Sequence, residues 1–416
     1  MGLLRDREFL KFWSGQSMSL IGSQFTLLAL PIAAGVGLHA TAAEMGVLAA
    51  LQFAPGLLFG LPAGVWLDRV RRRPVLIGSQ LASAAVLAWV PLAAALHVLT
   101  IQQLYAVAFL SGTAAAFFGV AQFAFVPALV GRDRLLEANA CAQTSQTAAS
   151  LIGPGLAGAA VQLLTAPIAV AVDAASFLVG AATAASVRVA EPAPPRAMGR
   201  SALREAIEGL ALVWRLPLVR AITGTLVIAN AGGGMAAPVL VLLFVGRIGL
   251  SPAQFGLVFV ASSASSLAGS VLIRPLQHRA GVGPAMVFAT ALVGAGAIVR
   301  AGAAFTHQPM TFPLLVAGAL VGGFGLMTYN VPQRAIQQAV VPDRLLGRAT
   351  AAVSLAIYAA SAGASLAGGL LGQLAGLRAT LVVAAAIMVL CALPTALGPL
   401  RALRELRPSP RPSSAA

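Results

Sequence analysis

The chain has 416 residues, of which 59% are hydrophobic and only 9% are charged, and its mean hydropathy is +0.89. Because soluble domains carry roughly 25% charged residues, this composition excludes a water-soluble globular protein and indicates that lipid surrounds much of the chain. The net charge of +15 does not indicate a nucleic-acid partner, because the basic residues lie in short gaps between apolar runs and not on a solvated face with aromatic residues.

In chain order the sequence contains twelve apolar runs, each long enough to cross the hydrocarbon layer as a helix of about 20 residues. They cover residues 14–37, 45–67, 75–96, 104–129, 139–164, 168–187, 218–245, 255–276, 283–305, 312–335, 349–374 and 380–397. Strands of a membrane barrel would be about ten residues long, with alternating side chains. We therefore predict an all-α membrane protein with twelve transmembrane helices.

The gaps between the runs are strongly asymmetric in charge. An even number of crossings leaves both chain ends on one side, and that side would hold every Lys and Arg except Arg247, Arg300 and Arg378. Loops rich in Lys and Arg stay on the cytoplasmic side of a membrane. We therefore expect a multi-pass protein of the inner (cytoplasmic) membrane with both termini in the cytoplasm. The polar stretch 1–11 does not have the form of a cleavable signal peptide.

Several of the predicted helices carry polar residues on one face. In chain order these are Gln16, Ser19 and Ser23 in the first helix, Asn139, Gln143, Gln146 and Ser150 in the fifth, Asn230 in the seventh, Tyr329, Asn330 and Gln333 in the tenth, and Ser354 and Tyr358 in the eleventh. Polar groups in lipid are costly unless they are partnered. These faces should therefore point into the bundle, where they either line a wet cavity or join helices by hydrogen bonds.

Two further features lie in the fifth and sixth helices. Gly153 and Pro154 predict a kink that allows the fifth helix to bend, because proline removes one backbone hydrogen bond; close packing by small residues, including Gly158, is the alternative. Asp173 is an acid well inside the sixth helix, and an intramembrane acid suggests a proton carrier. Its alternative is a structural hydrogen bond to a neighbouring helix.

The longest break between apolar runs is residues 188–217, which begin Pro-rich. Within it Ile207, Leu210 and Trp214 share one face of a predicted helix at 201–214, which would lie along the cytoplasmic interface. This linker separates a six-helix half, 1–187, from a second half, 218–400, which a tail, 401–416, follows. The sequence Asp-Arg-Leu-Leu occurs at 133–136 and 343–346, and Leu-Ala-Gly at 156–158 and 366–368. This common register predicts two parallel six-helix repeats.

Specific motifs resemble a known family. The loop Gly64-Val65-Trp66-Leu67-Asp68-Arg69-Val70-Arg71-Arg72-Arg73 is similar to the signature loop of the major facilitator superfamily, although the family most often has Gly at the position of Arg71. Gly153-Pro154-Gly155-Leu156-Ala157-Gly158 resembles the antiporter signature of exporters in that superfamily, with Ala157 in place of one Gly. The stretches Trp13-Ser14-Gly15-Gln16 and Asp173-Ala174-Ala175-Ser176-Phe177 resemble the branch that includes enterobactin exporters and macrolide efflux pumps.

This resemblance implies functional sites. Gly64, Asp68, Arg69 and Arg72 would form a latch in which Asp68 faces the start of the eleventh helix; the alternative is that the basic residues only set orientation. A central cavity between the halves would bind the substrate. Its candidate residues are Gln16, Ser19, Ser23, Gln143, Gln146, Asn230, Tyr329, Asn330 and Tyr358.

The expected function is export of a small amphipathic organic compound, such as a drug, an antibiotic or a siderophore, by a monomer that exchanges it for protons and alternates access. Proton-coupled uptake by the same fold, a lipid-linked transferase and a sensor built on a transporter fold are the alternatives. No cofactor or metal is expected, because Cys141 and Cys391 lie far apart and the sequence has no phosphate-binding loop with Lys.

Overall fold

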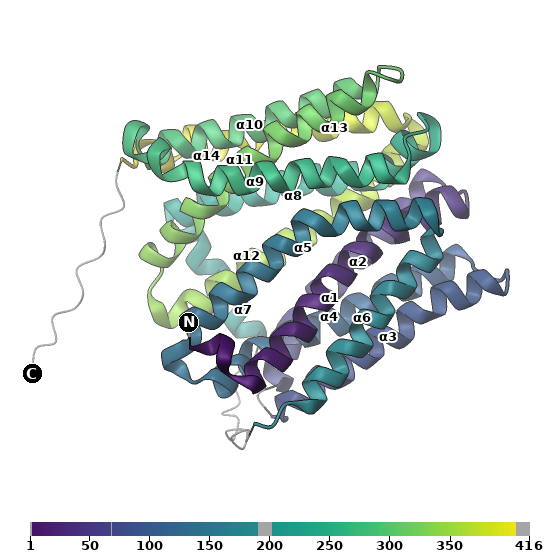
Figure 1. Cartoon of the computed structure of the whole chain (residues 1–416). Coiled ribbons are helices and arrows are strands. Elements are labelled where there is room, and N and C mark those ends of the chain that lie inside the picture. Colours follow the sequence, from purple (N-terminus) through teal and green to yellow (C-terminus); the bar gives the residue numbers. More distant parts are fainter. Residues whose placement is uncertain (1, 68, 190–201, 405–416) are drawn as a thin grey trace, which may run out of the picture.

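The structure is a computed structural model that describes residues 2–67, 69–189 and 202–404, nearly all of them in helices (Figure 1). The membrane-crossing helices are α1 (Arg7–Ile32), α2 (Ala42–Leu67), α3 (Arg72–Ala95), α4 (Ile101–Val130), α5 (Leu135–Leu163), α6 (Ala166–Ser186), α8 (Pro217–Leu240), α9 (Pro252–Ala280), α10 (Val282–Ala303), α11 (Thr311–Val340), α12 (Asp343–Leu374), and α13 (Leu377–Leu390) continued by α14 (Ala392–Leu397).

Eleven of these helical segments in the described residues are long and apolar enough to cross a membrane. The exception is α5, which is as long as its neighbours, with 29 residues, but carries the polar stripe noted above. It packs against α1 and α9 within the bundle, so the polar stripe lowers its hydropathy without removing it from the membrane. The predicted twelve-helix fold is confirmed.

The two halves repeat the same packing. In the first half α1 packs against α5 and α6, and α4 packs against α2 and α3. In the second half α8 packs in the same way against α12 and α13, and α11 against α9 and α10. Even the ends of α1 and α8 agree, since each continues into a π-helical segment, η2 (Ala33–Gly37) and η4 (Val241–Arg247). The parallel repeat predicted from the sequence is therefore confirmed.

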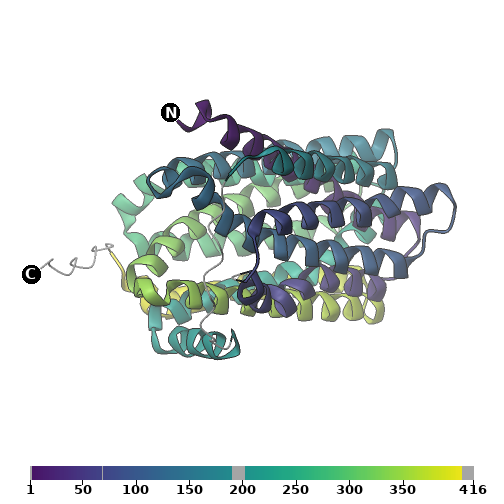
Figure 2. The same ribbon diagram turned by 90° about the horizontal axis from the view of Figure 1, so that it is seen from below.

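Both described chain ends lie at the same end of the helices (Figures 1 and 2), which we call the terminal face; the opposite end is the distal face. The halves touch near the distal face and diverge toward the terminal face (Figure 1). Glycines make the distal contact close. A Cβ atom on Gly46 of α2 would lie 2.8 Å from the Ser365 carbonyl oxygen of α12, and one on Gly158 of α5 would lie 2.5 Å from the Pro252 carbonyl oxygen at the start of α9.

A short helix in the linker, α7 (Ala202–Arg215), packs on the start of α12 and also contacts α2. Arg348 of α12 donates a hydrogen bond of 2.5 Å from its guanidinium to the Glu208 carboxylate of α7. Val213 is buried in a cluster that includes Ala349 and Val353, whereas Trp214 is 62% exposed. This helix thus ties the linker to the second half at the terminal face.

Candidate functional site

An apolar cavity of about 300 Å³ lies between the two halves, beside their distal contact. Helices α1, α2 and α5 line it from the first half, and α8, η4 and α9 from the second. Its wall is mostly aliphatic and aromatic, and includes Phe53, Phe255 and Phe259. We call it the interhalf cavity. Its size and lining suit the apolar body of a small organic molecule.

Two amide side chains, Gln24 of α1 and Gln52 of α2, interrupt the apolar wall of the interhalf cavity. Both are half-buried, and in the described part of the chain neither side chain makes a hydrogen bond. Polar groups in such surroundings normally have partners. These two amides are therefore available to donate hydrogen bonds to, or accept them from, a molecule held in the cavity.

A second cavity of about 490 Å³ separates α5 from α9 and α11 nearer the terminal face. Most of the residues that line it carry a hydroxyl or an amide group, so we call it the serine cleft. Its polar members are Gln143, Gln146, Thr147 and Ser150 of α5, Ser262, Ser263, Ser266 and Ser270 of α9, and Asn330 and Arg334 of α11. The two halves are therefore separated nearer the terminal face, where α5, α9 and α11 present these polar residues to each other.

A third cavity, of about 370 Å³, lies within the first half between α1, α4 and α5. Gln16 and Gln146 both line it, so the structure brings together two residues that the sequence singled out separately. The Gln16 side-chain oxygen is buried and has no hydrogen-bond partner among the described residues. Because Gln146 also lines the serine cleft, this residue stands between the two spaces.

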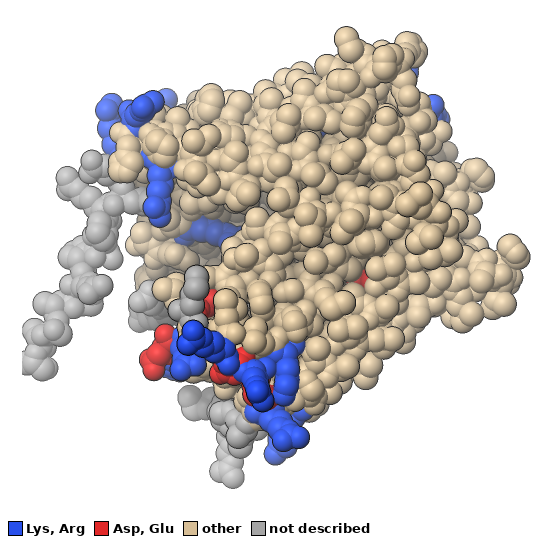
Figure 3. Space-filling model, in the orientation of Figure 1, with Lys and Arg blue, Asp and Glu red and all other residues tan. Residues whose placement is uncertain are grey.

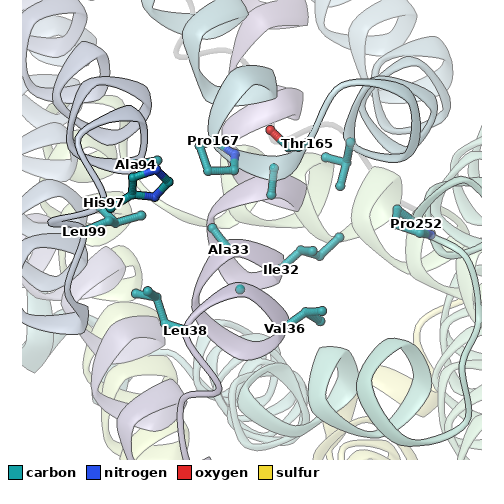
Figure 4. A pocket seen from close by; sticks show the side chains of 13 residues that line it. Ile32, Ala33, Val36, Leu38, Ala94, His97, Leu99, Thr165, Pro167 and Pro252 are labelled. Atoms are coloured by element: carbon teal, nitrogen blue, oxygen red, sulfur yellow. The ribbon is translucent and has the colours of Figure 1, made fainter.

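A fourth cavity, of about 500 Å³, opens at the distal face (Figure 4). The end of α1 and the π-helical turn after it form its floor, and His97, Thr165 and Pro252 stand around its rim. Its lining comes almost wholly from the first half. This pocket is thus separate from the space between the halves.

The structure places Ser19, Ser23 and Asp173 inside the first half. Ser19 is 4% exposed, and its hydroxyl donates to the Gln80 side-chain oxygen at 3.3 Å. Asp173 is 1% exposed, accepts a hydrogen bond of 3.2 Å from Ser176, and faces the Ser23 hydroxyl. None of the three lines the cavities described above. Their polar groups join α1 to α3 and α6.

Three candidates in the second half occupy different surroundings. Tyr329 is 3% exposed in a core cluster, and its hydroxyl faces Thr225 and Thr395 and not a cavity. The Asn230 amide donates to the Leu226 carbonyl oxygen of its own helix at 2.8 Å. Tyr358 lies across the contact between α12 and α2, close to Gly56, and is 37% exposed. Of the second-half candidates, only Asn330 lines the serine cleft.

The small residues of α5 pack closely against other helices. A Cβ atom on Gly153 would lie 2.5 Å from Cγ of Gln24, and the Pro154 carbonyl oxygen lies against Gly256 of α9. The helix runs unbroken through Pro154. Gly153 thus packs closely against α1, and the kink at Gly153 and Pro154 stays a prediction.

The latch residues lie at the terminal end of α2 and beyond it. Asp68, on which the latch depends, lies outside the described residues. Gly64 has open space around it, Arg69 is exposed, and Arg72 is half-buried at the start of α3. The predicted partner of Asp68 is the start of α12. There, Arg348 forms a salt bridge with Glu208 of α7.

Sequence reasoning missed Gln24, Gln52 and the four serines of α9 that line the serine cleft. A signal was present, since Ser262, Ser266 and Ser270 recur at helical spacing, and unpaired amides inside apolar runs are costly. The serines escaped notice because small polar residues also serve plain helix packing.

Comparison with known proteins identifies similar families and folds. Residues 12–231 and 222–416 each match the model of the Major Facilitator Superfamily. Macrolide efflux protein A from Streptococcus pyogenes, and the protein of that name from serotype M6, are 26% identical to this chain over 207 residues. That region is 50% of this chain and 51% of each relative, so the chain matches about half the length of these curated relatives.

Solved structures agree in fold. The crystal structure of nucleoside transporter NupG has a TM-score of 0.70 at 14% identity and covers 94% of this chain and 98% of its own. A bacterial homologue of the iron transporter ferroportin in its inward-facing state has a TM-score of 0.71 at 16% identity, with 94% and 98% covered. A bacterial homologue of the iron transporter ferroportin in an outward-facing state has a lower TM-score, 0.59.

Proposed function

We propose an export function for this chain, which belongs to the Major Facilitator Superfamily and is therefore a multi-pass membrane transporter and not an enzyme. Its substrate would be a small amphipathic organic compound, such as a drug, an antibiotic or a siderophore. Transport would alternate access by rocking residues 1–187 against 218–400 around the space between them.

The interhalf cavity is the observation that carries this proposal. Five helices from both halves form an apolar wall, and the amides of Gln24 and Gln52, which have no hydrogen-bond partner among the described residues, interrupt it. This lining favours a molecule with an apolar body and a few hydrogen-bonding groups. Gln16, Gln143, Gln146 and Asn330 would line its path toward the terminal face. In this proposal Ser19, Ser23, Asn230, Tyr329 and Tyr358 support the helices that shape the space.

Efflux is favoured over uptake by two findings. The relatives of 26% identity are named macrolide efflux proteins, and Gly153 to Gly158 resemble the signature of exporters. Protons would drive the exchange, with Asp173 as the proton carrier. The protein would act as a monomer in the inner membrane with the terminal face in the cytoplasm, since this orientation keeps basic loops on the cytoplasmic side.

The latch is part of the proposal. Asp68, supported by Gly64, Arg69 and Arg72, would hold α2 to the start of α12 when the terminal face closes. Arg348 already engages Glu208 of α7 at this place in the open form, so closure would rearrange charges around one helix start.

A paired assay tests the proposal. A host lacking its own pumps would express the chain and be screened for resistance to drugs and siderophores, and everted membrane vesicles would then be tested for proton-driven uptake of each hit. We expect Gln24→Leu to raise KM by about three- to tenfold, because one lost hydrogen bond costs about 0.5–1.5 kcal/mol. Gln373→Leu is the matched control, since Gln373 is exposed on α12 and outside the described cavities.

Solute movement into intact cells, with none into everted vesicles, would replace export by uptake. A chain that moves no compound in either preparation, although it is inserted in the membrane, would overturn the proposal.

A further inference from the structure

The interhalf cavity and the serine cleft lie one helical turn apart on the same two helices. On α5, Pro154 lines the first space and Ser150 the second; on α9, Phe259 lines the first and Ser262 the second. Residues four or three apart on a helix are neighbours on one face. The two spaces therefore adjoin along α5 and α9, and an elongated molecule that spanned them would have its apolar part toward the distal face and its polar part toward the terminal face.

The charge of the serine cleft is one-sided. Arg334 is the one charged residue in its lining, and neither this cleft nor the interhalf cavity has an acidic residue in its described lining. Met327, Asn330 and Arg334 share one face of α11 toward the cleft. Among the described residues, no carboxylate pairs with Arg334 and no hydrogen bond occupies its guanidinium. Its positive charge therefore faces an uncompensated space.

The uncharged residues that line the serine cleft also favour a negatively charged ligand. The hydroxyls of Ser262 and Ser263 and the amides of Gln143 and Asn330 supply donors that can turn toward an anion. An organic cation would find acceptor oxygens there but no counter-charge, and Arg334 would repel it. A basic residue that only set membrane orientation could sit anywhere at the terminal face; this one stands inside the cleft, opposite α5.

We propose that the serine cleft binds the negatively charged end of an amphipathic organic monoanion, such as a carboxylate, whose apolar body occupies the interhalf cavity, and that Arg334 determines this charge preference. The inference rests on the proposed transport function and specifies its substrate class. One guanidinium balances one negative charge, so a compound with several charges is not the expected ligand.

Three fluorescent probes with one apolar body test the charge preference directly. They are 1-pyrenebutyrate, the neutral 1-pyrenebutanol and the cationic pyrenebutyl-trimethylammonium. Binding to the purified full-length protein in detergent should be tightest for the carboxylate and weakest for the cation. Arg334→Gln should weaken carboxylate binding about three- to fivefold, since an exposed ion pair contributes up to about 1 kcal/mol, and should leave the alcohol unchanged. Added salt should reduce the preference.

Three further variants complete the test. Arg334→Lys should retain the preference and Arg334→Glu should reverse it. Arg279→Gln removes an exposed charge near the end of α9 that does not line the cleft, and should change nothing. Equal affinity for the three probes would overturn the inference, and so would a preference for the carboxylate that survives Arg334→Gln. In either case, binding of the alcohol would leave the transport proposal standing. Failure of all three probes to bind would overturn the inference, and the vesicle assay would then decide the transport proposal separately.

Discussion

The buried carboxyl group of Asp173 connects two helices of the first half. It lies on α6, and Ser176 of the same helix donates to it at 3.2 Å, while Ser23 and Thr26 face it from α1. A Cβ atom on Gly22 would lie 2.9 Å from its Oδ1 atom, so α1 approaches the carboxyl group as closely as its backbone allows. Within the described residues, hydroxyls and not a cation therefore hold this carboxyl group.

Replacing Asp173 separates a proton-carrying role from a purely structural one. Asp173→Asn keeps the size of the side chain and, like the protonated acid, both donates and accepts hydrogen bonds, but it cannot ionise. We expect substrate exchange between equal concentrations to continue and transport driven by a pH gradient to be lost. Both rates can be measured in proteoliposomes.

Asp173→Leu is the contrasting variant. It removes the carboxyl group that the Ser23 and Thr26 hydroxyls of α1 face, whereas the Ser176 hydroxyl of α6 keeps its bond of 2.8 Å to the backbone carbonyl oxygen of residue 173. A buried polar group left unsatisfied costs about 1–3 kcal/mol, so the variant should have a lower thermal stability. If Asp173→Asn transports under a pH gradient as fast as the parent, Asp173 is a structural residue and another group carries the proton.

The distal contact shows why glycine positions control the conformation of whole helices. Gly46 of α2 lies against backbone atoms of Ser365 and Gly369 on α12. Backbone atoms within a helix cannot move aside as a flexible side chain can. Any side chain larger than hydrogen at this position must push α2 and α12 apart.

Gly46→Val should therefore shift the protein away from the form that is open at the terminal face. Overpacking costs about 1–3 kcal/mol, enough to change the ratio of two conformations about fivefold or more. The readout is labelling of Gln143→Cys in the serine cleft by a maleimide that cannot cross the membrane, with Cys141 and Cys391 replaced. Labelling from the terminal face should fall.

Gly60→Val is the matched control on the same helix, because a Cβ atom there would have no neighbour within 4 Å. It has the same change in helix propensity but should label like the parent. Equal labelling of the two variants would show that the distal contact does not hold the open form in place.

The helices themselves could be predicted from the sequence, but their rotations could not. Long apolar runs report lipid contact directly, so even α5, the least apolar of the twelve, was recognised. Gln16, Ser19 and Ser23 share one face in sequence, yet Gln16 lines a cavity whereas Ser19 and Ser23 meet α3 and α6. Which residues of a polar face line a cavity depends on how the neighbouring helices pack against it. The periodicity of the sequence does not give that packing.

Arg300 illustrates the same limit. Near the end of α10 it could extend to the membrane surface, but its Nε donates to the Gly296 carbonyl oxygen at 3.3 Å and its side chain lies along Gly318 of α11. Glycines on both helices make room for the side chain inside the half. Their spacing is visible in the sequence, but the meeting of α10 with α11 is not.

At the scale of the whole molecule, charge is segregated to one end. Figure 3 shows most of the visible Lys and Arg side chains gathered toward the terminal face, while most of the visible surface between the two ends is uncharged. Loops with this composition remain in the cytoplasm. Reporter tags placed before residue 2 and after residue 416 should both be protected from protease in intact cells and exposed in everted vesicles. Tags on opposite sides would contradict the even number of crossings.

The pair formed by α5 and α9 allows the two ends of the molecule to be locked separately. At the distal face, the Ala253 backbone N–H donates to the Gln162 side-chain oxygen at 3.4 Å, and one turn earlier on α5 a Cβ atom on Gly158 would lie 3.0 Å from Cα of Ala253. Because the two backbones approach this closely, we expect cysteines at positions 162 and 253 to form a disulfide in the form described here. Across the serine cleft, cysteines at Gln143 and Ser270 should join only when the terminal face closes, because the open cleft separates α5 from α9.

Each disulfide should stop transport, and a reductant should restore it. The distal disulfide should trap the form that is open at the terminal face, and the cleft disulfide should trap the form that is closed there. With the distal pair oxidised, the serine cleft should stay open to a maleimide added at the terminal face. The cleft pair should oxidise slowly at rest and faster when substrate is supplied, because turnover visits the closed form. Transport that continues with the distal disulfide fully formed would show that the two halves need not separate there. Rocking around the interhalf cavity would then be the wrong mechanism for this fold, since alternating access requires each face to open in turn.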